Sequence, residues 1–212
     1  MTTTFQPPNP FETFCTATFR ILLDCMARPG TIGQIPEPSM FSQIPTISID
    51  CQPMPANRFA LTSCLSLLDQ ETRFAQAANA TWIDPQSDIN RWVQLRSNCR
   101  LSDAANAMFV YLWDSASSSL LHELNPGTLT FPEQSCTAFI AVPEITQSEP
   151  TWRLRGPGID GFCDVGVHGV VTDFAQNIIA TRAHFPLGID IVCIDTHGKC
   201  IALPRTCQIS WN

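Results

Sequence analysis

The sequence is poor in lysine and in tyrosine, with one residue of each kind, Lys199 and Tyr111. Eleven arginines supply the other basic side chains. Lysine provides amine chemistry, whereas arginine is suited to paired contacts with carboxylate or phosphate groups. The scarcity of lysine leaves a single candidate for covalent amine catalysis. Lys199 falls in a predicted hairpin turn, which is the wrong place for a buried imine.

The ten cysteines and four histidines do not have the spacing of a metal or redox site. The chain contains no C-x-x-C and no H-x-x-x-H motif, so any zinc site would have to be assembled from distant residues. A G-x-S-x-G nucleophile elbow is also missing. These absences favour buried, reduced thiols, with no metal ion and no hydrolase centre.

The chain is acidic, with 19 acidic residues against 12 basic ones and a net charge of −7. This balance argues against general binding to nucleic acid or to a membrane surface. The first ten residues, MTTTFQPPNP, have neither the basic nor the apolar region of a secretory signal. No apolar run is long enough to span a bilayer. We therefore expect a cytoplasmic protein that binds neither DNA nor membranes.

The chain is long enough to form one complete hydrophobic core. Of its 212 residues, 44% are hydrophobic, which distinguishes it from a disordered acidic tail. The 17 prolines are scattered instead of forming a linker, and no block of like charge divides the chain. We expect a single domain over residues 1–212.

Helices and buried strands alternate along most of the chain. Asn9 and Glu12 have the positions of a capping box, and Arg28-Pro29-Gly30 ends the helix that they begin. Further helices are predicted over residues 58–68, 87–95, 117–124 and 172–183. Buried strands are predicted over residues 107–113, 136–142, 152–155, 165–171, 189–194 and 200–203. This pattern predicts a three-layer α/β/α domain with a mixed β-sheet.

Asp190 is an acidic residue near the start of a strand that is otherwise apolar. If the last hairpin turns on His197-Gly198, residues whose numbers sum to 395 face each other, and Asp190 lies opposite Arg205. Opposite charges at this end of a sheet form charge-assisted hydrogen bonds. The favoured interpretation is a structural pair at the rim of the core. The alternative is a pair that helps to position an anion.

Two more arginines precede a glycine-rich turn. Arg153 and Arg155 alternate on one strand face, and Gly156-Pro157-Gly158 follows them. Backbone N–H groups beside guanidinium groups can hold phosphate or phosphonate. However, Pro157 removes one donor, and a tight turn between strands is the favoured interpretation. The candidate anion-binding residues are Arg153, Arg155, Gly156, Gly158 and Arg205.

Four stretches of the sequence stand out when they are taken in order along the chain. They are FRILLDCMARPGTI at residues 19–32, LRGPGI at 154–159, HFPLGIDI at 184–191 and ALPRTCQI at 202–209. In this combination they resemble the PhnH family, a subunit of the bacterial phosphonate carbon–phosphorus (C–P) lyase system. FPLGID followed by PRT is the most specific part of the resemblance, which covers almost the whole chain.

The resemblance implies a cytoplasmic homodimer with a fold like that of pyridoxal-phosphate (PLP)-dependent transferases, reduced to one domain and without that cofactor. It also implies assembly with the subunits PhnG, PhnI and PhnJ. With the ATPase-like protein PhnL, that assembly replaces the adenine of ATP by a phosphonate and forms ribose 1-phosphonate 5-triphosphate. PhnJ later cleaves the carbon–phosphorus bond. The resemblance identifies no catalytic residue in this chain.

Three functions are weighed on these grounds. An accessory subunit of the phosphonate-processing complex, not active alone, agrees best with the absence of a catalytic constellation. The alternative is an anion-binding catalytic subunit that uses Arg153, Arg155 and Arg205 on ATP or a phosphonate. A stand-alone PLP enzyme would need Lys199 as its Schiff-base lysine, and the predicted turn disfavours this.

Overall fold

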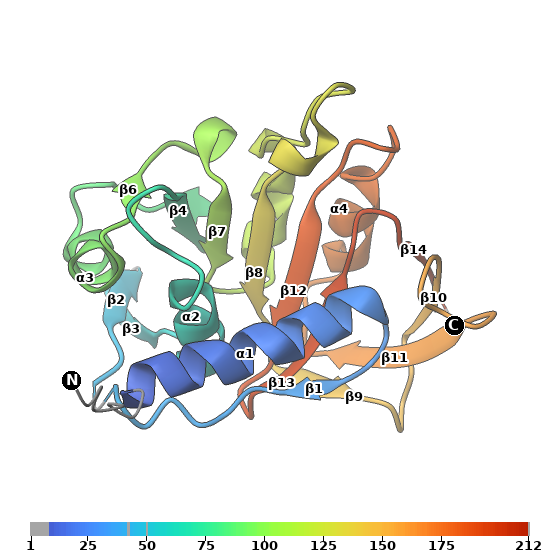
Figure 1. Cartoon of the computed structure of the whole chain (residues 1–212), viewed down its shortest axis with the longest axis horizontal. Helices are drawn as coiled ribbons and strands as arrows, with labels where there is room; N and C mark the ends of the chain where they lie inside the picture. The colour runs from blue at the N-terminus through green and yellow to red at the C-terminus, as the bar shows by residue number, and fades with distance from the viewer. Residues whose placement is uncertain (1–8, 42, 50, 212) are drawn as a thin grey trace, which may run out of the picture.

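The computed structural model describes residues 9–41, 43–49 and 51–211, and its main feature is an eight-stranded β-sheet (Figure 1). The strands of this sheet are β1 (Gly33–Gln34), β4 (Arg73–Ala78), β5 (Thr81–Trp82), β6 (Arg100–Leu101), β7 (Phe109–Leu112), β8 (Thr137–Ala141), β12 (Asp190–Ile194) and β13 (Lys199–Leu203). Their order is β1-β13-β12-β8-β7-β4-β5, with β6 beside β4. The central strands β12, β8, β7 and β4 run parallel to one another, and β13 and β5 run antiparallel to them. The edge strand β1 pairs antiparallel with β13. The sheet is therefore mixed, as the sequence predicts.

A second, antiparallel sheet lies beside the main one and was not predicted. Its order is β14 (Gln208–Trp211), β10 (Trp152–Arg155), β11 (Cys163–His168) and β9 (Glu144–Thr146). The strands predicted at 152–155 and 165–171 belong to this sheet, because an apolar run indicates a buried strand without indicating its neighbours. A separate antiparallel hairpin consists of β2 (Thr46–Ile49) and β3 (Gln52–Pro55).

A helix lies at each of the five predicted places, although the one predicted over residues 117–124 is a 3₁₀-helix. The helices are α1 (Pro10–Ala27), α2 (Arg58–Leu65), α3 (Asp88–Ser97), α4 (Phe174–Ala180) and the 3₁₀-helices η1 (Ala104–Asn106), η2 (Ala116–Glu123) and η3 (Pro132–Gln134). The capping box of α1 is confirmed, because the N–H of Glu12 donates to Asn9 Oδ1 at 2.9 Å and the N–H of Asn9 donates to Glu12 Oε2 at 3.1 Å. Within the described ranges, none of the helices combines the length and apolar character of a membrane span.

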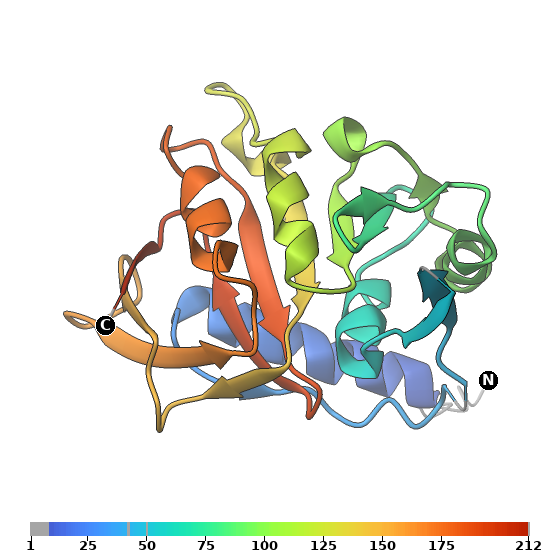
Figure 2. The ribbon, with the colours of Figure 1, turned by 180° about the vertical axis from the view of Figure 1, so that it is seen from behind.

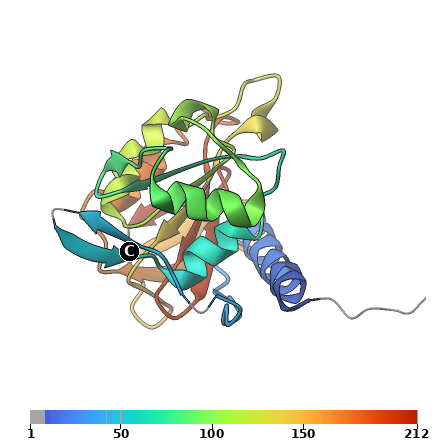
Figure 3. The same ribbon diagram turned by 90° about the vertical axis from the view of Figure 1, so that its left-hand side faces the viewer.

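Both faces of the main sheet are buried in hydrophobic layers. Alternate residues of β8 face opposite sides, with Ala138 and Ile140 in one core cluster and Phe139 and Ala141 in the other. Helices α1, α2 and α3 cover the Phe139 side (Figures 1 and 3). Helices η2 and α4 and the second sheet cover the Ile140 side (Figure 2). Because both faces are covered, the central strands are continuous apolar runs.

The register of the last hairpin differs from the prediction by one residue. Strands β12 and β13 pair Ile191 with Leu203 and Ile194 with Cys200, so facing residues sum to 394 instead of 395. The N–H of Asp195 donates to the carbonyl oxygen of Lys199 at 2.9 Å, which leaves three residues in the loop instead of the predicted two. The sequence does not reveal this extra residue, because Gly198, at φ +82°, suits loops of either length.

Asp195 is the buried acid that forms this loop. Its Oδ1 accepts the N–H groups of His197 at 2.8 Å and Lys199 at 2.9 Å, and its Oδ2 accepts the N–H of Ile145 at 3.2 Å. Asp195 is fully buried, and Ile145 belongs to β9. One carboxylate therefore closes the β12–β13 loop and fastens the second sheet to the main one.

We predict that Asp195→Ala lowers the free energy of unfolding by about 3 kcal/mol, because three backbone N–H groups lose their acceptor and that of Ile145 is buried. Urea denaturation measures this loss. Asp173→Ala is the matched control, since Asp173 is exposed and makes no side-chain capping bond, and it should change stability by less than about 0.5 kcal/mol. Equal losses in the two variants would contradict the role of Asp195.

Candidate functional site

Asp190 and Arg205 lie together at the amino end of β12. Nη1 of Arg205 is 3.7 Å from Oδ2 of Asp190, and the N–H of Arg205 donates to Oδ1 of Asp190 at 2.8 Å. Nη1 of Arg205 also donates to the carbonyl oxygen of Pro132 at 2.7 Å and to the hydroxyl of Ser135. By the observed register Asp190 would face Pro204. Arg205 reaches it because β13 has already ended at Leu203.

Arg182 is a further cation beside this pair, and sequence reasoning missed it. Its Nη2 donates to the carbonyl oxygen of Leu203 at 2.7 Å, and its Nη1 donates to that of Cys207 at 2.9 Å. Burial lowers the pKa of Arg182, while Cys207 and Asp190 act in the opposite direction. The available signal was a basic residue in the last turn of the helix predicted over 172–183, a position where cations commonly contact carbonyl oxygens.

Arg182 and Arg205 line a cavity that we call the arginine cavity. It has a volume of about 430 Å³ and is lined by residues of α4, of the loop that follows it, of the chain after β13 and of β14. Figure 2 shows the ribbon of these elements from behind. Its lining residues include both arginines together with residues that have amide, hydroxyl and apolar side chains. The full set is Gln176, Ile179, Ala180, Arg182, Ala183, Phe185, Arg205, Thr206, Cys207, Gln208 and Ile209.

Arg153, a predicted anion-binding residue, is paired with an acid inside the second sheet. Its Nε is 2.8 Å from Oδ1 of Asp164 and its Nη2 is 2.9 Å from Oδ2, which makes the contact bidentate. The guanidinium also lies over the ring of Phe162, 4.2 Å from the ring centre. These hydrogen bonds raise the pKa of Arg153. Its charge is therefore already balanced, and its geometry is that of a cross-strand ion pair.

The glycine-rich turn packs against a helix end of the wrong polarity for an anion. Gly158 has φ +84°, and a Cβ atom on it would lie 2.1 Å from the carbonyl oxygen of Ala27, the last residue of α1. The carboxyl end of a helix carries partial negative charge, which repels anions. Residues 156–161 have the spacing G-x-G-x-x-G, yet they join two antiparallel strands instead of leading from a strand into a helix. The turn is therefore a packing element.

The structure does not bring all the predicted anion-binding residues into one site. Arg205 lines the arginine cavity, Arg153 is held by Asp164, and Gly158 lies against α1. Arg155 is exposed, and its guanidinium group has no hydrogen-bond or ion-pair partner among the described residues. It pairs in register with Gln208, which lines the cavity, so Arg155 lies one strand away from the site.

Lys199 is engaged in the loop of the last hairpin. Its Nζ donates to the carbonyl oxygen of Ile145 at 3.1 Å, and its N–H donates to Asp195. The amine therefore has a structural partner where the main sheet meets β9. Across the described part of the chain, no three potential metal-ligand side chains gather into a group.

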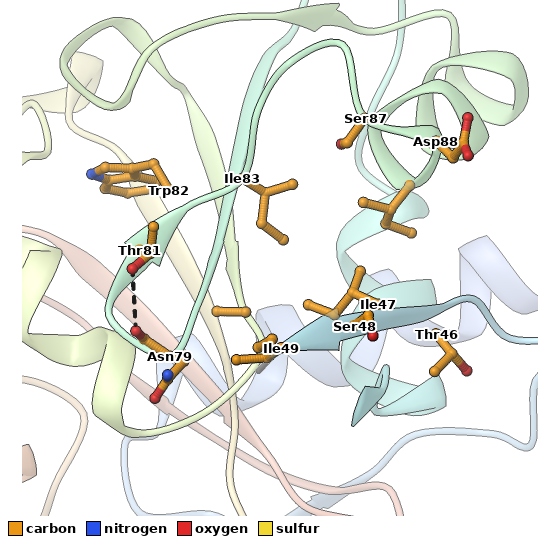
Figure 4. A pocket seen from close by; sticks show the side chains of 12 residues that line it. Thr46, Ile47, Ser48, Ile49, Asn79, Thr81, Trp82, Ile83, Ser87 and Asp88 are labelled. Carbon is orange, nitrogen blue, oxygen red and sulfur yellow. Dashed lines mark hydrogen bonds between the residues drawn. The ribbon is translucent and has the colours of Figure 1, made fainter. Parts of the chain in front are cut away.

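A larger cavity, of about 500 Å³, lies between β2, the β4–β5 hairpin and the start of α3. Figure 4 shows Ile47, Ile49 and Ile83 around its middle, with Trp82 and Asp88 toward opposite sides. Ser87, the capping residue of α3, already accepts the N–H of Asn90 at 3.4 Å. The lining is largely apolar and contains no nucleophile beside a base, so it offers packing surface instead of chemistry.

Comparison with known proteins gives one family match and two curated relatives. The family described as "Bacterial phosphonate metabolism protein (PhnH)" matches residues 12–210. The "Alpha-D-ribose 1-methylphosphonate 5-triphosphate synthase subunit PhnH" of Rhizobium meliloti (strain 1021) is 26% identical over 197 residues, which cover 91% of this chain and 88% of the relative. The "Putative C-P lyase subunit protein HtxG" of Stutzerimonas stutzeri is 34% identical over 97 residues, or 45% of this chain and 49% of the relative.

We predict that Gly158→Ala destabilises the protein by about 3 kcal/mol or more, because a β-carbon adds a clash with Ala27 to the cost of a left-handed backbone. Gly161→Ala is the matched control, since Gly161 has φ +74° and no atom within 4 Å of an added Cβ. It should cost about 1 kcal/mol. Thermal or urea unfolding measures both losses. If they were equal, the turn would not be packed against α1.

Proposed function

The chain belongs to the PhnH family of bacterial phosphonate metabolism proteins, and on this basis we propose that it is a subunit of the synthase of alpha-D-ribose 1-methylphosphonate 5-triphosphate. This synthase is the activity named for the Rhizobium meliloti relative, which aligns over nearly its full length. The HtxG relative, named as a C–P lyase subunit, supports the same phosphonate-degrading system. The assignment agrees with the resemblance of the FPLGID and PRT stretches.

We further propose that the chain is an accessory subunit without a reaction centre of its own. This proposal rests on the hydrogen bonds and ion pairs that the polar side chains of the protein already make. Asp195 accepts three backbone N–H groups, Arg153 is paired with Asp164, and Lys199 donates to a carbonyl oxygen. Among the described residues these groups serve to join segments of chain, and none forms a nucleophile–base pair. Catalysis then depends on the other subunits of the assembly.

The partners and the fold relationship are part of the same proposal. We propose that the chain forms a homodimer and assembles with PhnG, PhnI and PhnJ in the cytoplasm. We also propose that its fold is a reduced, three-layer form of the PLP-dependent transferase fold that works without PLP. The mixed sheet with helices on both faces supports the relationship. The engagement of Lys199 with Ile145 argues against a Schiff base.

Reconstitution tests the accessory role. Purified PhnG, PhnI, PhnJ and PhnL are incubated with ATP and methylphosphonate, with and without this chain, and formation of the triphosphate product is followed by phosphorus NMR. We expect product only when the chain is present, and no turnover by the chain alone. An undiminished rate without the chain would disprove the proposal, and so would turnover by the isolated chain.

Lys199→Arg separates the accessory subunit from a PLP enzyme. Arginine keeps a donor for the carbonyl oxygen of Ile145 but cannot form an aldimine. We expect the variant to support the reconstituted reaction at a rate within about twofold of wild type, because its role is structural. Loss of the reconstituted reaction with the variant would contradict this prediction. In the wild-type protein, an absorption band that borohydride abolishes, with the label mapped to Lys199, would also contradict it.

A further inference from the structure

We propose that the arginine cavity binds a small tetrahedral oxyanion that carries an apolar substituent, with Arg182 as its main contact. Neither the family match nor the curated relatives assign a ligand to this chain. The proposal concerns binding by this chain alone. It holds whether or not the chain is an accessory subunit of the synthase.

Arg182 has a positive charge without a carboxylate to balance it. Within the described ranges no acidic oxygen lies within 4.0 Å of its guanidinium, and both of its hydrogen bonds go to neutral carbonyl oxygens, those of Leu203 and Cys207. Its Nε is shut off from solvent and has no hydrogen-bond partner. Removing a cation from water without an opposite charge is costly. The attraction of an anion in the cavity would offset this desolvation cost.

The neighbouring groups leave this charge unbalanced. Asp190 is the nearby acid, and it is engaged with both the N–H and the guanidinium of Arg205. The thiols of Cys193 and Cys207 also lie near Arg182, but burial raises both pKa values, that of Cys193 to about 12. Thiols with such pKa values are neutral at pH 7. Two guanidinium groups and one carboxylate therefore leave one net positive charge at the cavity.

A structural role explains only part of the Arg182 contacts. Two of the five N–H groups fasten the segment from Leu203 to Cys207 against the end of α4. The backbone carbonyl oxygens of Ile178, Ile179 and Ala180 are already satisfied, because the N–H groups of residues 181–183 donate to them. Nη1 and Nη2 each keep a second N–H group that no described residue accepts, and these two groups can donate to a ligand.

The cavity lining indicates the chemical class of that ligand. Guanidinium groups match the planar pairs of oxygen atoms that phosphate and phosphonate present. Ile179, Phe185 and Ile209 add apolar walls, and Thr206 adds a hydroxyl. A volume of about 430 Å³ exceeds what a bare inorganic ion needs and is within the usual range of small-molecule sites. An oxyanion with a short apolar group fits both parts of this lining.

Calorimetric titration of the full-length protein with methylphosphonate, inorganic phosphate and ATP tests the proposal. We expect saturable binding of methylphosphonate that is at least as tight as that of phosphate and that weakens as salt is added. No saturable binding of methylphosphonate or phosphate at concentrations up to about 10 mM would overturn the proposal. If phosphate bound and methylphosphonate did not, the ligand would not carry an apolar substituent. If only ATP bound, the ligand would not be a small oxyanion.

Ala183→Glu and Ala183→Gln test whether the anion binds in the arginine cavity, and they leave both arginines in place. Ala183 is exposed and lines the cavity, so both side chains fit at its mouth without disturbing the core. A carboxylate there competes with the bound anion, and we expect at least about tenfold weaker binding for Ala183→Glu. Ala183→Gln, the matched neutral control, should change the affinity by less than about twofold. Equal weakening in the two variants, with unfolding temperatures unchanged, would overturn the location of the site.

The charge of Arg182 is tested separately by Arg182→Lys, which keeps the cation but loses the fork of N–H groups. We expect weaker anion binding in a variant that still folds but has a lower unfolding midpoint, because the two bonds to Leu203 and Cys207 lose their fixed geometry. Unchanged binding in the folded variant would overturn the role of Arg182. These measurements use the isolated chain, so a negative result contradicts the anion site alone. The reconstitution measures product formation by the whole assembly, so a negative result there contradicts the proposed accessory role.

Discussion

The attachment of the second sheet to the main sheet depends on the buried carboxylate of Asp195. It closes the loop between β12 and β13 and also accepts the N–H of Ile145 in β9. Lys199 approaches the same residue from the other side and donates to its carbonyl oxygen. Both polar groups of Ile145 are thus bound by the hairpin loop of the main sheet. The second sheet is held at this junction, and with it the positions of Arg153 and the glycine-rich turn.

The predominance of arginine over lysine has a structural explanation in this protein. Arg153 joins β10 to β11, Arg182 joins the end of α4 to the chain before β14, and Arg205 joins that chain to Pro132 and Ser135. Each guanidinium group connects segments by more than one hydrogen bond, which an ammonium group does with less fixed geometry. Arg182 differs from the other two because it has no carboxylate partner among the described residues, and this difference distinguishes a candidate binding group from structural ones.

The family assignment and the geometry support the same view of function. A subunit whose polar groups mainly join segments of its own chain suits a protein that contributes surface, stability or a bound anion to an assembly. A reaction centre would instead require groups left free to react, and Lys199, the one amine-bearing side chain, is engaged in a hairpin loop. The arginine cavity is compatible with this view, because binding an anion requires charge and shape without covalent chemistry.

Local patterns in the sequence were sufficient to predict the main helices, the buried central strands, the mixed sheet and the family. The capping box at Asn9 and Glu12 and the apolar runs of β7, β8 and β12 are decided by neighbours in the chain. Asp190 and Arg205 were recognised as partners because both lie near the open end of one hairpin. The register around them was wrong by one residue, since loop length is weakly encoded.

Tertiary structure alone decided which distant groups meet. Asp195 and Ile145 are 50 residues apart, Arg182 and Leu203 are 21 residues apart, and Gly158 lies against the end of the first helix. No periodicity or spacing records such contacts, because they depend on how whole elements pack. The sequence by itself therefore determined what kinds of elements form and to which family the chain belongs. The packing of the second sheet and of the chain after β13 gave Arg153 and Arg205 carboxylate partners and left Arg182 without one among the described residues.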